Sequence, residues 1–270
     1  MPNMIKEASF HDGSQIRVED VIWTLNTLKE KGHPFYKFYY GNVKVAKKIS
    51  DREVKFIFQG ERNLELPLII GQMKILSQKY WEDKFEDVLL ESPVGSGPYK
   101  VKDFKAGRTI EFEKVADYWG KDLAVNKGRF NFERITVEYF RDATVALEAF
   151  KSGDYDFREE NQAKRWSNAY NFPAIENGRV KKESVKHEIP TGMQGFFINT
   201  RKEIFKNRTV RKALNYAFDF EWTNKILFFD QYKRTNSFFS NSDLASSGLP
   251  SEKEFELLNS FRNQLPNDFE

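Results

Sequence analysis

The fold is decided by residues 95–120, which begin Gly95-Ser96-Gly97-Pro98-Tyr99 and end Asp117-Tyr118-Trp119-Gly120. The opening is typical of a turn, because glycine tolerates unusual φ angles and proline fixes its own φ near about −65°. Two short runs follow, at 99–104 and 109–115, and the second alternates apolar with charged residues in the manner of a half-buried strand. The stretch therefore predicts a β-hairpin that is closed by an aromatic plug at Tyr118 and Trp119.

The composition is that of a globular chain. Its 270 residues suffice for one large or two medium domains, and 43 Lys+Arg against 40 Asp+Glu leave no basic excess that would predict a nucleic-acid partner. Cysteine is absent, which excludes disulfides, thiolate zinc sites and cysteine nucleophiles. No apolar run reaches the roughly 18 residues of a membrane span, so we expect no direct membrane insertion, and the first residues lack the features of a signal peptide.

Upstream of the hairpin, the sequence predicts a helix and a second hairpin. Apolar residues at helical spacing place the helix over 18–31, with Gly32 as its stop. The alternating runs 43–49 and 53–58 predict the second hairpin. Between them, residues 35–40 are almost all aromatic. Such a run could stack sugars or bases, but we expect it to pack the helix onto the sheet.

Downstream of the hairpin, the pattern predicts a strand at 134–140, a helix from Ala143 that Gly153 ends, and a short strand at 155–157. A strand, a helix and a strand in this order form a βαβ crossover, which implies parallel pairing. Asp154 and Asp156 would lie on one face of the last strand. Without a third ligand they do not predict a metal site.

The rest of the chain predicts two more strands and a helical pair. Strands are expected at 179–188 and at 190–200, and the second of these is interrupted by glycines. A glycine inside a strand often marks a place where another backbone or a ligand approaches closely. Helices are expected at 208–218 and 221–229, with Asp219 as the N-cap of the second. The first of these two helices should bury a stripe formed by Val210, Ala213, Leu214, Ala217 and Phe218.

Several motifs in this order resemble the bacterial extracellular solute-binding proteins of family 5, which serve peptide ABC transporters. They are F-H-D-G-S at 10–14, G-S-G-P-Y at 95–99, the G-D-Y-D of 153–156 and F-x-x-x-x-V-R-x-A-L-x-x-A-x-D at 205–219. Residues 216–224 resemble the YejA-like branch, the oligopeptide and microcin C-type uptake proteins. The chain departs from the family pattern at two positions after the first motif. Gln15 replaces a proline, and Arg17 replaces a threonine that caps the helix, which should make the helix start less stable by about 1 kcal/mol.

The resemblance implies an α/β fold of the periplasmic-binding-protein-like type II class, bilobal and with mixed sheets. It assigns 1–93 to an accessory part of the first lobe, 94–152 to the hairpin and crossover of that lobe, and 153–270 to the start of the second lobe. Family members are considerably longer, so the chain resembles an incomplete form of the fold. We therefore expect a fragment that begins inside one lobe and stops inside the other.

The function implied is that of a monomeric periplasmic receptor, without a cofactor or a metal, that closes on an extended oligopeptide. Its partner would be an inner-membrane ABC permease with its ATPase. Peptide capture by backbone hydrogen bonds needs an accessible strand. The glycine-marked strand runs beside the hinge in relatives, so the candidate ligand-binding residues are Met193, Gln194, Gly195 and Asn199. The alternative is that these residues only pack inside the strand.

Two other functions remain open at this point. The chain could be a truncated remnant of such a receptor with no function of its own. It could also be a hydrolase, but His11, His33 and His187 are the three histidines and none lies near a serine in a G-x-S-x-G turn. His11-Asp12 has the residue types of a catalytic dyad, although an aspartate before a glycine is typical of a structural turn. We therefore predict a binding protein and no catalytic residue.

Overall fold

The structure, a computed structural model, describes residues 5–88 and 90–265 and divides the chain into two compact units. The units are Met1–Leu147 and Glu148–Glu270, so the division falls inside helix α5 (Ala143–Ser152). The sequence placed a boundary at 152/153, and its assignment of the parts to two lobes stays a prediction. No helix in the described ranges has the length and apolar character to cross a membrane.

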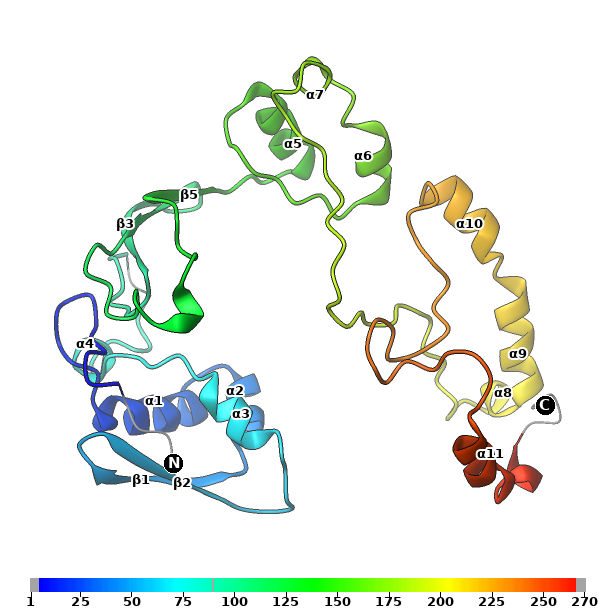
Figure 1. Ribbon diagram of the computed structural model, residues 1–270, viewed down its shortest axis with the longest axis horizontal. Coiled ribbons are helices and arrows are strands. Elements are labelled where there is room, and N and C mark those ends of the chain that lie inside the picture. The colour runs from blue at the N-terminus through cyan, green and yellow to red at the C-terminus, as the bar shows by residue number, and fades with distance from the viewer. Residues whose placement is uncertain (1–4, 89, 266–270) are drawn as a thin grey trace. The chain divides into compact units, whose positions relative to one another are not determined.

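The first unit is built around helix α1 (Val18–Glu30), which packs on the hairpin of β1 (Val43–Ser50) and β2 (Glu53–Phe58) (Figure 1). The hairpin is antiparallel, with β-bulges near both ends. Val18, Leu25 and Val43 are fully enclosed in this core. Both predicted elements are confirmed, because each has its apolar stripe covered by the other.

The start of α1 is held by Asp20 rather than by its N-cap residue. The buried Asp20 carboxylate accepts a hydrogen bond from the Arg17 backbone N–H at 2.8 Å and another from the Gln78 N–H at 2.9 Å. Gln78 opens helix α4 (Gln78–Trp81), and helix α3 (Leu66–Gly71) precedes it. Asp20 therefore replaces part of the capping that Arg17 cannot supply, and it joins two helix starts.

The aromatic run at 35–40 divides between core and surface. It forms the short helix α2 (Pro34–Tyr39) and its C-cap. Tyr40 is buried in the core and Tyr36 packs against it, whereas Phe35 and Phe38 are exposed. The expectation that the run packs the helix onto the sheet is therefore confirmed only for one side of α2.

The second sheet of this unit contains the hairpin that the sequence predicts within residues 95–120. Strand β4 (Thr109–Lys114) pairs antiparallel with β3 (Tyr99–Lys105) on one side and with β5 (Arg134–Glu138) on the other. The indole N–H of Trp119 donates to the Ser96 carbonyl at 2.9 Å. This bond closes the hairpin with the predicted aromatic plug. A 3-10 turn, η1 (Ala124–Asn126), lies in the loop before β5.

The predicted parallel crossover is absent from the described residues. Gly153 ends α5 as predicted, with a φ of +86°. Residues 155–157 are not a strand, however, and both sheets are wholly antiparallel. The side chain of Tyr155 contacts the ring of Phe150 and accepts a hydrogen bond from Arg158, so this segment is held by side chains instead of a strand partner. The α/β character is confirmed, and the parallel pairing was wrong.

The second unit has helices joined by long extended segments. Its helices are α6 (Ala163–Asn168), α7 (Pro173–Glu176), α8 (Glu203–Lys206), α9 (Arg208–Ala217), α10 (Phe220–Leu227), α11 (Glu252–Asn259) and the 3-10 turn η2 (Arg262–Gln264). The predicted helical pair is confirmed as α9 and α10. Asp219 caps α10 as predicted, because its carboxylate accepts from the Trp222 N–H at 2.9 Å.

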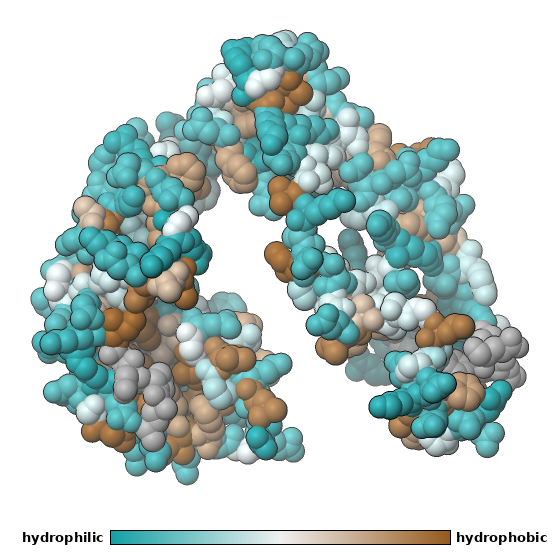
Figure 2. Space-filling model, in the orientation of Figure 1, coloured by the Kyte–Doolittle hydropathy of each residue, from teal (hydrophilic) through white to brown (hydrophobic). Residues whose placement is uncertain are grey.

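The strands predicted at 179–188 and 190–200 do not form. Both segments lack strand pairing within the residues that the structure describes. A strand exists only where a neighbour completes its backbone hydrogen bonds, and here no neighbouring strand is present. The stripe expected to be buried on α9 is also open, since Leu214 and Phe218 are exposed. Figure 2 shows apolar residues at the surface among the hydrophilic ones.

Candidate functional site

The predicted ligand-binding residues lie in the extended segment 187–199 of the second unit. Its first part is anchored by the loop at Ser240 and Asn241. Thr191 N–H donates to the Ser240 carbonyl at 2.9 Å, and the Asn241 amide donates to the carbonyls of His187 and Ile189 at 3.2 and 2.7 Å. The segment therefore begins at a fixed place and continues without a strand partner among residues 5–88 and 90–265.

Most of residues 192–198 are exposed, whereas Ile198 is half-buried. Gln194 and Gly195 are exposed and Met193 is half-buried, and Gln194 makes no side-chain hydrogen bond to any described residue. Phe196 and Phe197 are 90% and 82% exposed. Phe196 contacts Phe218, just after α9, with ring centroids 6.4 Å apart. Three of the four predicted residues are thus together and accessible.

Asn199 has a local structural role. Its side-chain oxygen accepts hydrogen bonds from the Arg201 backbone N–H at 3.1 Å and from Arg201 Nε at 3.3 Å, and its carbonyl accepts from Lys202 N–H. These bonds form a turn that leads into α8. The carboxamide oxygen of Asn199 is therefore engaged in this turn, and a ligand contact through it would require the turn to change.

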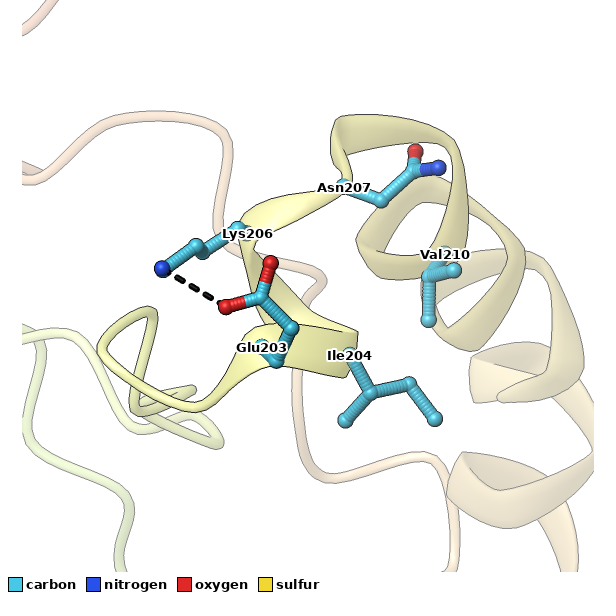
Figure 3. A pocket seen from close by; sticks show the side chains of 5 residues that line it. All are labelled: Glu203, Ile204, Lys206, Asn207 and Val210. Atoms are coloured by element: carbon cyan, nitrogen blue, oxygen red, sulfur yellow. Dashed lines mark hydrogen bonds and ion pairs between the residues drawn. The ribbon is translucent and has the colours of Figure 1, made fainter.

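A hollow beside α8 and α9 is lined by Glu203, Ile204, Lys206, Asn207 and Val210 (Figure 3). Its volume is about 620 Å³, and it is open to the surroundings. Two contacts engage its polar groups: Lys206 Nζ lies 2.7 Å from a Glu203 carboxylate oxygen, and the Asn207 side-chain oxygen accepts from Thr209 N–H at 2.8 Å. Because the hollow is open and the Lys206 and Glu203 charges compensate each other, it does not resemble an enclosed ligand site.

Arg211, in the V-R-x-A-L motif, anchors α8 to α9. Its guanidinium donates to the carbonyls of Phe205 and Lys206 at 2.6 and 2.8 Å. Carbonyls at a helix C-terminus have no partner inside the helix, so a cation there is favourable. The part of the chain that carries the motif at 205–219 is thus a structural joint of two helices.

Sequence reasoning missed a polar cluster in the second unit, which we call the Arg158 cluster: Tyr155, Arg158, Glu160 and Tyr170. Arg158 donates to Tyr155 OH at 2.9 Å and to Tyr170 OH at 3.1 Å, and its Nη2 lies 3.2 Å from Glu160 Oε2. The Tyr170 hydroxyl donates to the same carboxylate oxygen at 3.0 Å. The only signal in the sequence was a charged pair placed among aromatic residues.

The Arg158 cluster is enclosed, and its charges are mutually compensated. The side chains of Arg158 and Glu160 are 13% and 3% exposed. Burial acts to raise the pKa of Glu160, but hydrogen bonds from Gln162 N–H, Tyr170 and Arg158 outweigh it and hold the pKa below its usual range. Burial raises the pKa of the Tyr170 hydroxyl. The cluster therefore contains an ionised pair with no free acid or base, which suits a structural role.

Two of the sequence motifs and the aromatic plug meet in the first unit, at the turn of 95–97. His11 N–H donates to the Gly95 carbonyl at 2.8 Å, and the His11 ring contacts Gly95 N and Gly97 O. On the other side of the turn, Trp119 holds the Ser96 carbonyl. His11 is therefore engaged with backbone, and Asp12 bonds Ser14 instead of the imidazole, so the two residues do not form a catalytic dyad.

No group of three or more acidic or histidine side chains that could hold a metal ion occurs in the described ranges. The predicted segment 192–198 offers backbone, amide and apolar groups. Such groups can hold a solute by hydrogen bonds and contact, and they offer no nucleophile with a base.

Comparison with known proteins gives the family. The model of the bacterial extracellular solute-binding proteins, family 5 Middle, matches residues 5–263. The chain is 41% identical to the protein named "Probable peptide-binding protein YejA" of Agrobacterium fabrum, over 97% of the chain and 44% of that protein. It is 38% identical to the peptidoglycan-binding protein YepA of the same organism, over 98% of the chain and 45% of that protein. The chain thus spans less than half the length of these relatives.

The fold is also similar to that of a solved binding protein. The oligopeptide-binding protein AppA of Bacillus subtilis, solved with a nonapeptide, superposes with a TM-score of 0.61 and 21% identity, over 96% of this chain and 51% of that one. The α/β fold of the periplasmic binding proteins is therefore confirmed. The chain belongs to the bacterial extracellular solute-binding proteins of family 5, which are binding proteins and not enzymes.

Proposed function

We propose that this chain contributes the peptide-contacting segment 192–198 to a periplasmic receptor for extended oligopeptides. The receptor would deliver its ligand to an inner-membrane ABC permease driven by an ATPase. The observation that carries the proposal is that 192–198 is extended, mostly exposed and without a strand partner among the described residues, in a chain whose relatives include a protein named as peptide-binding.

The proposed mode of capture is strand addition. An extended peptide supplies the N–H and C=O groups that a lone strand lacks, and these bonds do not depend on the peptide's side chains. At about 3.3 Å per residue, seven residues span about 23 Å, the length of a peptide of about seven residues. Gln194 would add one side-chain bond, and the rings of Phe196 and Phe197 would contact apolar side chains of the ligand.

The positive charges that follow the segment favour one orientation of the bound peptide. The exposed side chains of Arg201 and Lys202 lie two and three residues after Asn199, and Arg201 is oriented by its bond to Asn199. Cations attract the carboxylate that ends a peptide. We therefore place the ligand's C-terminus toward Arg201 and expect an amidated C-terminus to weaken binding.

Titration calorimetry with peptides of three to nine residues tests the proposal. Binding should increase with length up to about seven residues, and Gln194→Ala should weaken it about fivefold, the worth of one hydrogen bond of about 1 kcal/mol. Gln72→Ala is the matched control, because Gln72 is an exposed glutamine of the first unit. Equal affinity for free amino acids and peptides, an unchanged affinity in Gln194→Ala, or no binding would overturn it.

A second ligand class is favoured by one finding, the peptidoglycan-binding protein among the relatives. Peptides released from peptidoglycan are also short and extended, so the same segment would suit them. The two classes separate in a competition experiment with soluble muropeptides. If muropeptides displace a bound unbranched peptide at a lower concentration than the same free peptide does, peptidoglycan fragments are the preferred ligand.

A further inference from the structure

One edge of the three-stranded sheet in the first unit is open. The strand order is β3-β4-β5, and among residues 5–88 and 90–265 no strand pairs with the outer side of β5. The opposite edge, formed by β3, has a β-bulge between Val101 and Asp103 and carries the exposed lysines Lys100, Lys102 and Lys105. Bulges and lysines keep an edge strand from pairing, and the register of β5 has no bulge. The outer side of β5 is therefore the edge at which another strand can add.

The backbone groups that face this open edge are those of Arg134, Thr136 and Glu138. Just beyond β5, the Tyr139 N–H donates to the Arg108 carbonyl at 2.7 Å, so residue 139 bonds toward β4. Because antiparallel bonding alternates along a regular strand, the odd-numbered residues of β5 bond β4 and the even-numbered ones point away from it. The N–H and C=O groups of these three residues have no hydrogen bond to a described residue. Such a row of unpaired groups is a template for a further strand.

The side chains of β5 divide by chemistry between the two faces of the sheet. Ile135 and Val137 lie on one face, 36% and 37% exposed, opposite apolar residues of β4. Arg134, Thr136 and Glu138 lie on the other face. A strand that added to the edge would cover part of both apolar side chains, which the first unit leaves open.

We propose that β5 pairs antiparallel with β5 of a second copy of this chain, about a two-fold axis at Thr136. The strand reads Arg134-Ile135-Thr136-Val137-Glu138, with a cation at one end and a carboxylate at the other. Antiparallel pairing about its centre places each Arg134 opposite Glu138 of the other copy, and each Ile135 opposite the other copy's Val137. Thr136 meets its own equivalent, as a two-fold axis requires. The result is a dimer, in place of the monomer that the family resemblance implies.

Backbone bonding and charge select the same register. In this register the residues whose backbone groups point outward lie opposite one another, so all of them bond across the interface. A displacement by two residues would remove both pairs of Arg134 with Glu138. A displacement by four would place Arg134 opposite Arg134, or Glu138 opposite Glu138. Because opposite charges stabilise a cross-strand pair and like charges destabilise it, the strand specifies one self-complementary register.

Both charged side chains are available for these contacts. Arg134 Nε lies 3.1 Å from Glu111 Oε1, an oxygen that Lys102 Nζ also contacts at 2.8 Å. The Arg134 side chain is 62% exposed, and the terminal nitrogens of its guanidinium are further donors. Glu138 is exposed and forms no ion pair with a described residue. The second copy would therefore give Glu138 a counter-charge without taking one from Glu111.

Self-pairing uses the open edge of each copy and then stops. The outer strands of the joined sheet are the two copies of β3, with their bulge and lysines, so the sheet does not grow beyond two chains. A contact made by one pair of strands is small. We therefore expect a dimer that dissociates on dilution.

Sedimentation velocity of the whole chain without ligand, from about 5 to about 500 μM, tests the dimer. The sedimentation coefficient should rise with concentration. Arg134→Glu opposes two carboxylates in each charge pair and Glu138→Arg opposes two guanidiniums, so each should raise the dissociation constant at least about tenfold. Lys44→Glu is the matched control, because it reverses an exposed charge of the other sheet and should leave the dissociation constant unchanged. A chain that stays monomeric, or charge reversals with no more effect than the control, would overturn the proposal.

Mixing the two variants separates a loss of pairing from a loss of folding. One Arg134→Glu chain and one Glu138→Arg chain place opposite charges at both cross-strand positions. The mixture should therefore associate at least about tenfold more tightly than either variant alone. A mixture that associates no better than its components contradicts the proposed register.

Hydrogen exchange in the natural chain needs no variant. When the chain concentration rises from about 5 to about 500 μM, the amides of Arg134, Thr136 and Glu138 should gain protection, whereas those of Ile135 and Val137, which already bond β4, should change little. The amides of 192–198 should not respond to chain concentration. If the even-numbered amides of β5 gain protection only when a peptide of about seven residues is added, the edge binds a peptide and the dimer is wrong.

Discussion

Replacing Glu160 by glutamine should destabilise the second unit strongly, although the side chain keeps its shape. Glu160 Oε2 is shared by Arg158 and by the Tyr170 hydroxyl, at 3.2 and 3.0 Å. An amide oxygen can still accept from one of them, but it carries no charge. The guanidinium of Arg158, 13% exposed, would then be enclosed without its counter-charge.

The size of the effect follows from burial. Removing one member of a buried ion pair costs about 3–5 kcal/mol, because the other charge stays desolvated. Here the Arg158 side chain keeps its bond to Tyr155 and retains some contact with solvent, which reduces the loss. We expect about 2–4 kcal/mol, a large share of the stability of a domain of this size.

Urea unfolding measures this loss, with hydrogen exchange in α6 to place it in the second unit. Glu159→Gln is the matched control, because Glu159 is the exposed neighbour and should change stability by less than about 0.5 kcal/mol. If Glu160→Gln and Glu159→Gln unfold at the same urea concentration, the reasoning from burial is refuted.

The pH dependence of this difference has a defined sign. The pKa of Glu160 is lower in the folded chain than its usual value of 4.5. The stability that its charge supplies is therefore fully present above pH 4.5 and is lost as the pH falls through the folded pKa. The difference between the natural chain and Glu160→Gln should thus be constant from pH 7 to 5 and shrink at lower pH. A difference that grows on acidification would contradict this sign.

Three more substitutions have outcomes set by packing or by a helix cap. Leu25→Ala, at a fully enclosed site, should cost the first unit about 2–5 kcal/mol in urea unfolding. Gly120→Ala would place a Cβ 2.7 Å from the Tyr118 ring, so the ring must move, at a cost of about 1–3 kcal/mol and with a changed near-ultraviolet dichroism. Asp219→Ala removes the acceptor of the Trp222 N–H and should lower the protection of the first turn of α10 by about 0.5–2 kcal/mol.

Each of these has a control in the same unit. Leu68→Ala, at a site 68% exposed on α3, should be nearly neutral, and a loss equal to that of Leu25→Ala would refute the assigned core. Gly71→Ala meets no atom within 4 Å, so it should leave the dichroism unchanged. Asp219→Asn keeps an acceptor at the cap, and a loss as large as that of Asp219→Ala would show that the cap bond is not the cause.

The sequence predicted best those elements whose partners lie nearby in the chain. Helix α1 and the two hairpins are confirmed because each carries an apolar stripe and meets a neighbour within about 40 residues of sequence. The cap at Asp219 is likewise local, since it needs only the next three residues. Local chemistry fixes such elements whatever the rest of the fold does.

It failed where the outcome depends on a distant partner. Residues 179–188 and 190–200 were predicted as strands, the second of them interrupted by glycines, but a strand needs a neighbour, and none is present in the described part of the chain. Asn199 was predicted to face a ligand, whereas its side chain forms a turn with Arg201. The Arg158 cluster was missed because only folding brings its charges to the two tyrosines.

The central claim is that 192–198 pairs with an extended peptide. Hydrogen exchange of the whole chain, with and without the tightest-binding peptide of about seven residues, tests this claim most directly. The account predicts that alternate amides of 192–198 become protected when the peptide binds, as they do when a strand gains a partner on one side. Peptide binding that protects other residues and leaves the amides of 192–198 unchanged would contradict it.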